Sequence, residues 1–295
     1  MKITNHTFPR LGAFFSEHGL STRHELIAQF RDIGLTAVQI ADPLLTELIA
    51  NPSQAAAVVE DFGNAGLDII GLAGYRNLIA VDPVKRRENI DFLKACMDLA
   101  PVLGTAVVAT ESGTFNPGSE WDPSPENSSP QAWAVLLDSL GELLEKAKAT
   151  GTILAIEGYV NNIVGRLDQI DALFRTFPTP HLALMLDPYN YISRDLLPTA
   201  DLICEEFLGR YADRFVIAHL KDVAPLGADG TPDDNGGRAD LVGTPEFCTG
   251  VFPQQGYMRF LRNRRPDLPI ILEHLPVAHL PEAMRRFRSL VGLPI

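Results

Sequence analysis

The sequence predicts a single-domain α/β protein, a closed (β/α)8 TIM barrel that spans residues 1–295. Eight short apolar segments alternate with eight helical segments, which is the pattern of parallel β/α architecture. The chain has 295 residues, 46% of them hydrophobic, and a barrel of this kind typically takes about 250 residues. No Ser/Gly linker, short repeat or sharp change of composition divides the chain. The count of eight strands favours a closed barrel over an open, doubly wound sheet.

The first half of the chain shows clear helix boundaries. Thr22 and Glu25 have the spacing of a capping box, and Gly34 is expected to end the helix that they open. Asn51-Pro52 supplies an N-cap and a first-turn proline for a second helix, and Asp82-Pro83 opens a third. The strands expected in this half are residues 8–15, 37–41, 67–73 and 105–109.

The second half repeats this alternation. Ser129-Pro130 begins a helix that runs to about Ala149. Further helices are expected over residues 168–174, 202–207, 258–265 and 281–290, and strands over residues 153–156, 182–186, 215–218 and 270–272. Residues 114–129 and 223–245 are expected to be long irregular loops; loops of this length in a compact domain are usually functional or disordered. Both follow strands, so we expect both at the carboxyl ends of the barrel strands.

Composition and charge argue against several classes of partner. The formal net charge is −12, whereas binding to a nucleic-acid backbone needs a basic face. No run approaches the ~20 apolar residues of a membrane span. The three cysteines, Cys96, Cys204 and Cys248, are isolated and lack CxxC spacing, as is typical of a reducing compartment. We therefore expect a cytoplasmic protein with neither a nucleic acid nor a membrane as partner.

The segment Arg214–Asp222 shows how a strand of this protein ends. Its apolar run is followed at once by His219, Lys221 and Asp222. Side chains alternate along a strand, so His219 and Lys221 share one face and Asp222 takes the other. In parallel α/β folds, ligands bind at the carboxyl ends of the strands. These polar residues are therefore candidates for a functional site.

Polar residues also close the neighbouring strands of the second half. Strands five to eight end in Glu157, Asp187, His219 and Glu273, and a barrel brings such ends together around one mouth. One imidazole among carboxylates suits Mn²⁺, Mg²⁺, Co²⁺ or Zn²⁺. Without a cation, three crowded carboxylates would repel one another. Any one of these acids alone would be interpreted as a solvated or ion-paired residue, but four successive strand ends predict one divalent metal ion, with Mn²⁺ favoured.

Four segments carry a resemblance to a known family: Ile156-Glu157-Gly158, Leu186-Asp187-Pro188-Tyr189-Asn190, Ala218-His219-Leu220-Lys221-Asp222 and Leu272-Glu273. With these segments the sequence resembles the xylose isomerase-like TIM barrel superfamily, in its sugar phosphate isomerase/epimerase branch. The resemblance implies that Glu157, Asp187, His219 and Glu273 bind one divalent cation. It also implies that Glu157 and Glu273 are catalytic and transfer a proton on opposite faces of a sugar carbon.

The expected function is therefore that of a metal-dependent epimerase or isomerase of a sugar or sugar-like polyol, acting through an enediolate. A dehydratase of the inosose dehydratase type is the alternative, because both reactions begin with removal of a proton beside a carbonyl. A metal-dependent endonuclease is less favoured. Asn190 stands where many family members carry a histidine, and His6, His18, His24 and His181 offer no obvious second metal cluster. A catalytically silent sugar-binding protein is not favoured, because both Glu157 and Glu273 are present.

Three further residues are candidates for contact with a small carbohydrate substrate: Asn190, Lys221 and Glu111. Tyr75 follows the third strand and is expected near the pocket. His274 is expected to face the surrounding helices and to be structural, because it alternates with Glu273. Barrels of this type often pair, so a homo-oligomer stays open as an alternative to a monomer.

Overall fold

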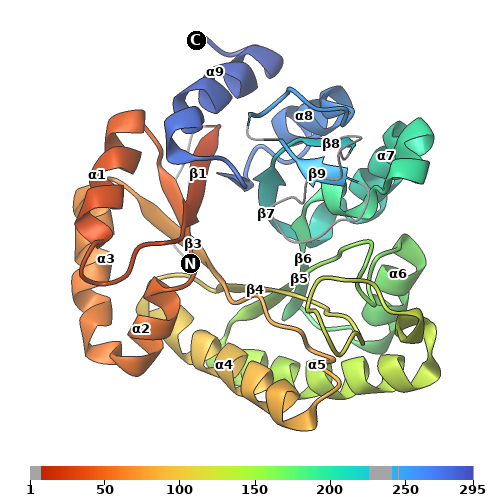
Figure 1. Ribbon diagram of the computed structural model, residues 1–295. Helices are drawn as coiled ribbons and strands as arrows, with labels where there is room; N and C mark the ends of the chain where they lie inside the picture. The colour runs from red at the N-terminus through yellow and green to blue at the C-terminus, as the bar shows by residue number, and fades with distance from the viewer. Residues whose placement is uncertain (1–7, 226–240, 245, 295) are drawn as a thin grey trace.

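The computed structural model describes residues 8–225, 241–244 and 246–294 (Figure 1). Its parallel strands close into a barrel in the order β1-β10-β7-β6-β5-β4-β3-β2, which confirms the expected (β/α)8 barrel. The barrel strands are β1 (Arg10–Phe15), β2 (Ala37–Ile40), β3 (Asp68–Ala73), β4 (Val107–Glu111), β5 (Ile153–Glu157), β6 (Leu182–Leu186), β7 (Phe215–Leu220) and β10 (Pro269–Leu272).

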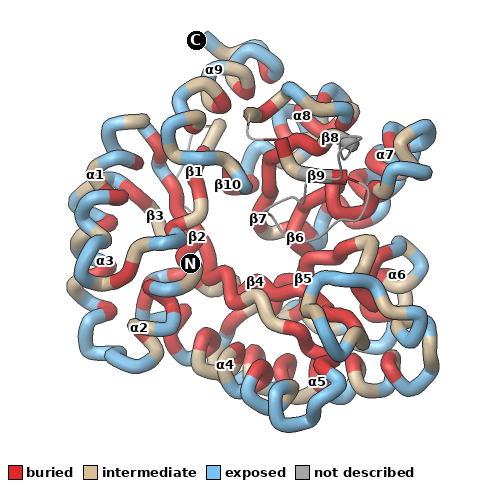
Figure 2. The backbone as a smooth tube through the Cα atoms, viewed as in Figure 1, coloured by how far each residue is buried: buried red, intermediate tan, exposed pale blue. Residues whose placement is uncertain are grey.

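Helices surround the strands, as Figure 1 shows. Figure 2 shows mostly buried residues in the strands, and exposed residues on the outer sides of the helices. The helices are α1 (Arg23–Ile33), α2 (Leu44–Ala50), α3 (Ala55–Asn64), α4 (Pro83–Val102), α5 (Pro130–Thr150), α6 (Leu167–Thr176), α7 (Ala200–Arg210), α8 (Gln254–Asn263) and α9 (Leu280–Leu290). None of the helices in the described residues is long and apolar enough to span a membrane.

Most of the expected helix boundaries are present. The Asp82 side chain accepts a hydrogen bond from the backbone N–H of Val84, and Ser129 accepts one from Ala132, so both residues cap their helices. Gly34 ends α1 in the left-handed conformation, with φ of 85°. The expected capping box at Thr22 is wrong, because the Thr22 hydroxyl accepts a bond from the N–H of Gly19 at 3.3 Å instead.

Two further expectations need correction. Asn51-Pro52 opens a short 3₁₀ turn (Pro52–Gln54) ahead of α3, and α2 precedes it in a segment where no helix was expected. The expected loop over residues 223–245 is in part a ribbon, because β8 (Val223–Pro225) pairs antiparallel with β9 (Leu241–Gly243). Residues 226–240 lie outside the described part of the chain.

The barrel interior follows a period of two that positions the site. Its inner layer includes small and aliphatic residues: Ala37, Ala109, Ala155, Met185, Ile217 and Ile271. Two positions further along each of these strands come buried polar residues: Gln39, Glu111, Glu157, Asp187, His219 and Glu273. Side chains two apart on a strand share a face. The polar residues therefore form the next layer of the barrel, at the carboxyl ends of the strands.

Candidate metal centre

Four of these polar side chains meet at one point of the barrel. Glu157, Asp187, His219 and Glu273 each offer a ligand atom, and these atoms all lie within 4.8 Å of one another. All four residues are buried. They come from β5, β7 and the ends of β6 and β10, so closure of the barrel brings together residues that are distant in the sequence. The structure thus assembles the four residues that were expected to share a cation.

His219 lies at the centre of this cluster. Its Nδ1 is 3.4 Å from Glu273 Oε2, 3.5 Å from Glu157 Oε2 and 3.9 Å from Asp187 Oδ2. Its Nε2 lies 3.0 Å from Oε1 of Gln39. An amide oxygen accepts, so Nε2 carries a proton, and in the neutral ring the lone pair of Nδ1 faces the carboxylates. The ring therefore has the orientation that metal binding through Nδ1 requires.

Lys221 supplies a buried positive charge to the same cluster. Its Nζ donates to Asp187 Oδ2 at 2.7 Å and to Glu273 Oε2 at 2.8 Å. Asp222, on the opposite face of the chain as expected, accepts hydrogen bonds from the backbone N–H groups of Val223 and Gly250. Lys221 therefore faces the site, whereas Asp222 anchors the chain behind it.

The two glutamates differ in the groups that hold them. Glu157 accepts from neutral donors, the hydroxyl of Tyr75 at Oε2 and Nδ2 of Asn190 at Oε1, the latter at 2.6 Å. Glu273 has basic groups beside it instead: Lys221, and His274, whose Nε2 is 3.3 Å from Oε1. Burial raises the pKa of Glu273, but Lys221 and then His274 outweigh it and hold that pKa well below its usual value.

The protons that Asp187 and His219 hold indicate how much positive charge the buried carboxylates need. Burial, which Lys221 only partly offsets, raises the pKa of Asp187 to about 8. Burial opposes protonation of His219, but the charges of Glu273 and Glu157 outweigh it and raise its pKa to about 10. At neutral pH the cluster thus retains two protons that these groups ordinarily lose. A divalent cation carries the same charge as these two protons. Its binding in their place therefore leaves the net charge of the cluster unchanged.

Unpartnered atoms support the same conclusion. Asp187 Oδ1 and His219 Nδ1 are buried and have no hydrogen-bond partner among the described residues. Such atoms cost free energy unless something binds them. Carboxylate oxygens with one imidazole form the donor set that hard and borderline divalent ions accept. The residues present therefore fit one divalent cation.

Glu111 lies beside this cluster but outside it. It ends β4 in register with Glu157 at the end of β5. Burial, the largest cause, raises the pKa of Glu111 to about 8. A hydrogen bond from Asn162 lowers this pKa, whereas the charges of Glu120 and Glu157 raise it further. The expected substrate contact thus lies in the polar layer of the barrel, next to a proposed catalytic residue.

Sequence reasoning missed two neighbours of the centre and misplaced a third. Gln39 follows Ala37 by two positions, so the period of two along β2 could have indicated it. Phe14, whose ring centroid is 5.3 Å from that of His219, lies two positions after Gly12 on β1, so the same period of two could have indicated it. His274 was expected to face the helices, but its side chain lies beside Glu273 instead. Its backbone has a φ of 55°, which departs from the extended conformation of a strand. That backbone conformation leaves no signal in the strand pattern.

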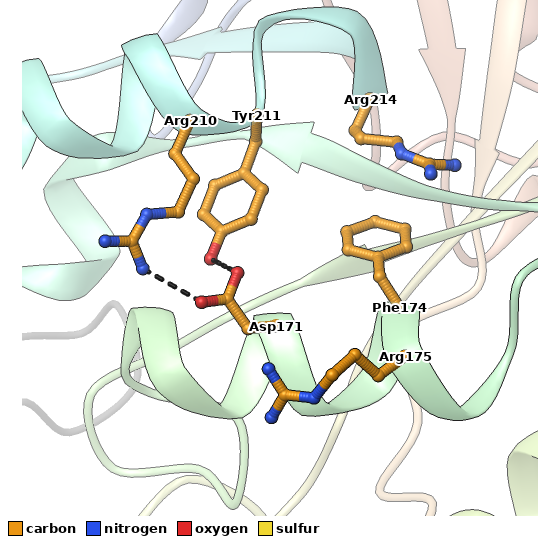
Figure 3. Close-up of a pocket in the computed structure, with 6 residues that line it drawn as sticks. All are labelled: Asp171, Phe174, Arg175, Arg210, Tyr211 and Arg214. Carbon is orange, nitrogen blue, oxygen red and sulfur yellow. Dashed lines mark hydrogen bonds and ion pairs between the residues drawn. The ribbon is translucent and has the colours of Figure 1, made fainter.

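A separate cavity of about 310 Å³ lies between α6 and α7 on the outside of the barrel (Figure 3). It is lined by Asp171, Phe174, Arg175, Arg210, Tyr211 and Arg214. Tyr211 donates to Asp171 at 2.7 Å, and Arg210 pairs with the other oxygen at 3.0 Å. None of the expected site residues contributes to this cavity, which is therefore distinct from the metal centre.

Fold and site together define a class: a (β/α)8 barrel with a candidate divalent-metal centre at the carboxyl ends of its strands. The chain belongs to the xylose isomerase-like TIM barrel family, which its sequence matches over residues 27–290. No curated protein sequence matches it significantly.

Solved structures with this fold include enzymes of different reaction types. The probable 3-DHS dehydratase AsbF of Bacillus anthracis has a TM-score of 0.70 at 13% identity, with 92% of this chain and 97% of that chain covered. An L-ribulose 3-epimerase has a TM-score of 0.69 at 15% identity, with 96% and 94% covered. A xylose isomerase-like TIM barrel protein from Mycobacterium smegmatis, in complex with magnesium, has a TM-score of 0.65 at 16% identity, with 93% and 90% covered. At such identities the similarity establishes the fold alone.

Proposed function

We propose that this protein is a divalent-metal-dependent epimerase or isomerase of a sugar or sugar-like polyol. The observation that carries the proposal is that Glu157 and Glu273 meet at one point, with Oε2 atoms 3.5 and 3.4 Å from Nδ1 of His219. An epimerase needs two carboxylates around one substrate carbon, one to remove a proton and one to return it. These two glutamates supply that pair.

The metal would be held by Glu157, Asp187, His219 and Glu273. When bound, a divalent cation polarises a substrate carbonyl and acidifies the adjacent C–H group. Glu273 is ionised, as a proton acceptor must be, because Lys221 holds its pKa low. Tyr75 and Asn190 hold both oxygens of Glu157, and Glu157 is proposed to act on the other face of the substrate carbon. Each correctly positioned proton-transfer group contributes roughly 10²–10⁴-fold.

Three side chains are proposed to bind the substrate around this pair. Asn190 is bonded to Glu157 and can also offer its amide to a substrate hydroxyl group beside it. Lys221, already bonded to two carboxylates, can donate its remaining N–H to a substrate oxygen. Glu111 lies one strand away from Glu157 and can accept from a hydroxyl group. The proposed partner is therefore a small carbohydrate.

A dehydratase remains the second candidate, because the mouth contains proton donors. Loss of a β-hydroxyl requires an acid near the leaving group, and the sequence offered neither His219 nor Asn190 for that role. The structure adds Tyr75 and His274, which contact Glu157 and Glu273. The fold is also similar to that of a probable 3-DHS dehydratase. An endonuclease is less favoured, because the described residues contain one candidate metal cluster and the chain is strongly acidic.

The proposal is tested by metal analysis together with a screen of ketoses and inososes in deuterated water. We expect one divalent ion per chain, Mn²⁺ ahead of Mg²⁺, Co²⁺ or Zn²⁺, and a product that has gained deuterium at one carbon without loss of water. Glu157→Gln and Glu273→Gln should both abolish turnover, whereas Glu60→Gln, the same change at an exposed site on α3, should not. A product lighter by one water would show a dehydratase.

Compartment and assembly stay proposals. The three cysteines are free, which supports a cytoplasmic location, where thiols stay reduced. We propose a homo-oligomer only because barrels of this type often pair. Sedimentation of the purified protein measures its assembly directly.

A further inference from the structure

Glu111 and Asn162 form a buried polar pair whose hydrogen bonds are incomplete. Nδ2 of Asn162 donates to Oε2 of Glu111 at 3.0 Å, and the two residues are 3% and 5% exposed. Glu111 Oε1 and Asn162 Oδ1 have no hydrogen-bond partner among the described residues. Leaving a buried acceptor without a donor costs about 1–3 kcal/mol. Asn162 Oδ1 therefore needs a donor, and Glu111 Oε1 needs a partner, that the described chain does not supply.

The position of this pair places it within reach of a substrate at the metal centre. Glu111 and Glu157 are register partners on neighbouring parallel strands, and such strands lie about 4.8 Å apart. Glu111 follows Ala109 by two positions, as Glu157 follows Ala155, so both side chains point into the barrel. A small polyol held at Glu157 can therefore extend to Glu111.

Positive charge near this pair is already committed to carboxylates. Lys221 is bonded to Asp187 and Glu273. Arg76, after β3, is paired with Asp42 at 2.8 Å and stacked on the ring of Phe92. A phosphate group needs such cations free to bind it. Neither of these two side chains is free to do so.

Negative charge surrounds Glu111 instead. Glu120 and Glu157 are close enough that their charges contribute to the raised pKa of Glu111. A phosphate dianion would meet repulsion here, whereas a hydroxyl group would meet acceptors.

We propose that Glu111 and Asn162 bind a hydroxyl group of the substrate, and that the substrate is an uncharged polyol or keto sugar, not a sugar phosphate. This inference rests on the proposed function. One hydroxyl donates to Asn162 Oδ1 and pairs with Glu111 Oε1, either as acceptor from the protonated carboxyl or as donor to the ionised one, and an ordered water takes its place when no substrate is bound. A fully ionised phosphoryl oxygen carries no proton to donate to Asn162 Oδ1, which is an acceptor only.

The test compares matched pairs of uncharged and phosphorylated ketoses. Calorimetry with Mn²⁺-loaded protein would measure the binding of L-ribulose and L-ribulose 5-phosphate, and of D-fructose and D-fructose 6-phosphate. We expect each uncharged ketose to bind at least about 10-fold more tightly than its ester. Arg175→Ala/Arg214→Ala removes two cations from the outer cavity, so phosphate binding there is not mistaken for binding at the mouth.

Variants of Glu111 test the contact itself. Glu111→Met keeps the approximate shape but removes both oxygens, and should weaken ketose binding about 10-fold, the value of one to two hydrogen bonds. Glu111→Gln keeps an acceptor oxygen and should therefore weaken ketose binding less than Glu111→Met does. Glu60→Gln is the exposed control and should change nothing.

The outcomes separate this inference from the proposed function. Tighter binding of an ester than of its ketose in the Arg175→Ala/Arg214→Ala protein overturns the uncharged substrate and leaves the metal enzyme standing. Unchanged ketose affinity in a folded Glu111→Met protein shows that the pair holds only a structural water, and overturns the subsite. Failure of every ketose to bind while Mn²⁺ binds also overturns this inference. Failure of Mn²⁺ alone to bind overturns the proposed function.

Discussion

The amide oxygen of Gln39 lies 3.0 Å from Nε2 of His219, and this contact determines which face of the imidazole meets the carboxylates. Both residues are fully buried. Because the oxygen of Gln39 accepts the Nε2 proton, Nδ1 is left unprotonated in the neutral ring and points at Glu157 and Glu273. The candidate metal centre therefore depends on a residue that contributes no ligand atom to it.

Gln39→Met should weaken Mn²⁺ binding about 10–100-fold, because an unsupported imidazole can change its tautomer and turn. Titration calorimetry with Mn²⁺ measures the effect. Gln131→Met, the same change at an exposed position of α5, is the control. An unchanged dissociation constant for Gln39→Met would show that packing alone orients His219.

Lys221→Met should destabilise the metal-free protein by about 3 kcal/mol, because Asp187 and Glu273 lose their buried cationic partner. Saturating Mn²⁺ should reduce this loss, since its charge compensates the same carboxylates. Urea unfolding with and without Mn²⁺ gives both values, and Lys148→Met on the exposed face of α5 is the control. An equal loss in both conditions would contradict the shared role in charge compensation.

Glu111→Gln should stabilise the protein at pH 8 but not at pH 4. The pKa of Glu111 is about 8 in the folded protein and about 4.3 when unfolded. Between these values the folded state holds a proton that the unfolded state releases, so the stability of the wild type falls as the pH rises. Glutamine has no such proton. Thermal unfolding across pH 4–8 should show a growing difference in midpoint; a constant difference would refute the raised pKa.

Ser129→Ala should lower the free energy of unfolding by about 1 kcal/mol, because the Ser129 side chain caps α5 through the backbone N–H of Ala132 at 3.1 Å. Mn²⁺ affinity should stay the same, since the cap lies outside the metal centre. Urea denaturation and calorimetry report the two quantities. Ser53→Ala, at an exposed serine outside the α-helices, should leave both unchanged.

The sequence by itself determined the architecture and the four central side chains. Alternating apolar and helical segments encode the barrel because strand and helix periods are local properties of the chain. Closure then places every strand end at one mouth, so Glu157 and Asp187 could be joined to His219 and Glu273 without knowledge of a single distance.

Only the tertiary structure decided which neutral groups hold these residues. Gln39 and His219 are 180 positions apart, and Tyr75 and Glu157 are 82 apart, so no local pattern links them. Their contacts depend on strand register, which shifts between Val38 and Gln39 where β2 meets β3. His274 lies beside Glu273 with a backbone torsion that alternation does not describe. Periodicity specifies the face of a strand, but contacts across the barrel depend on how the strands close around it.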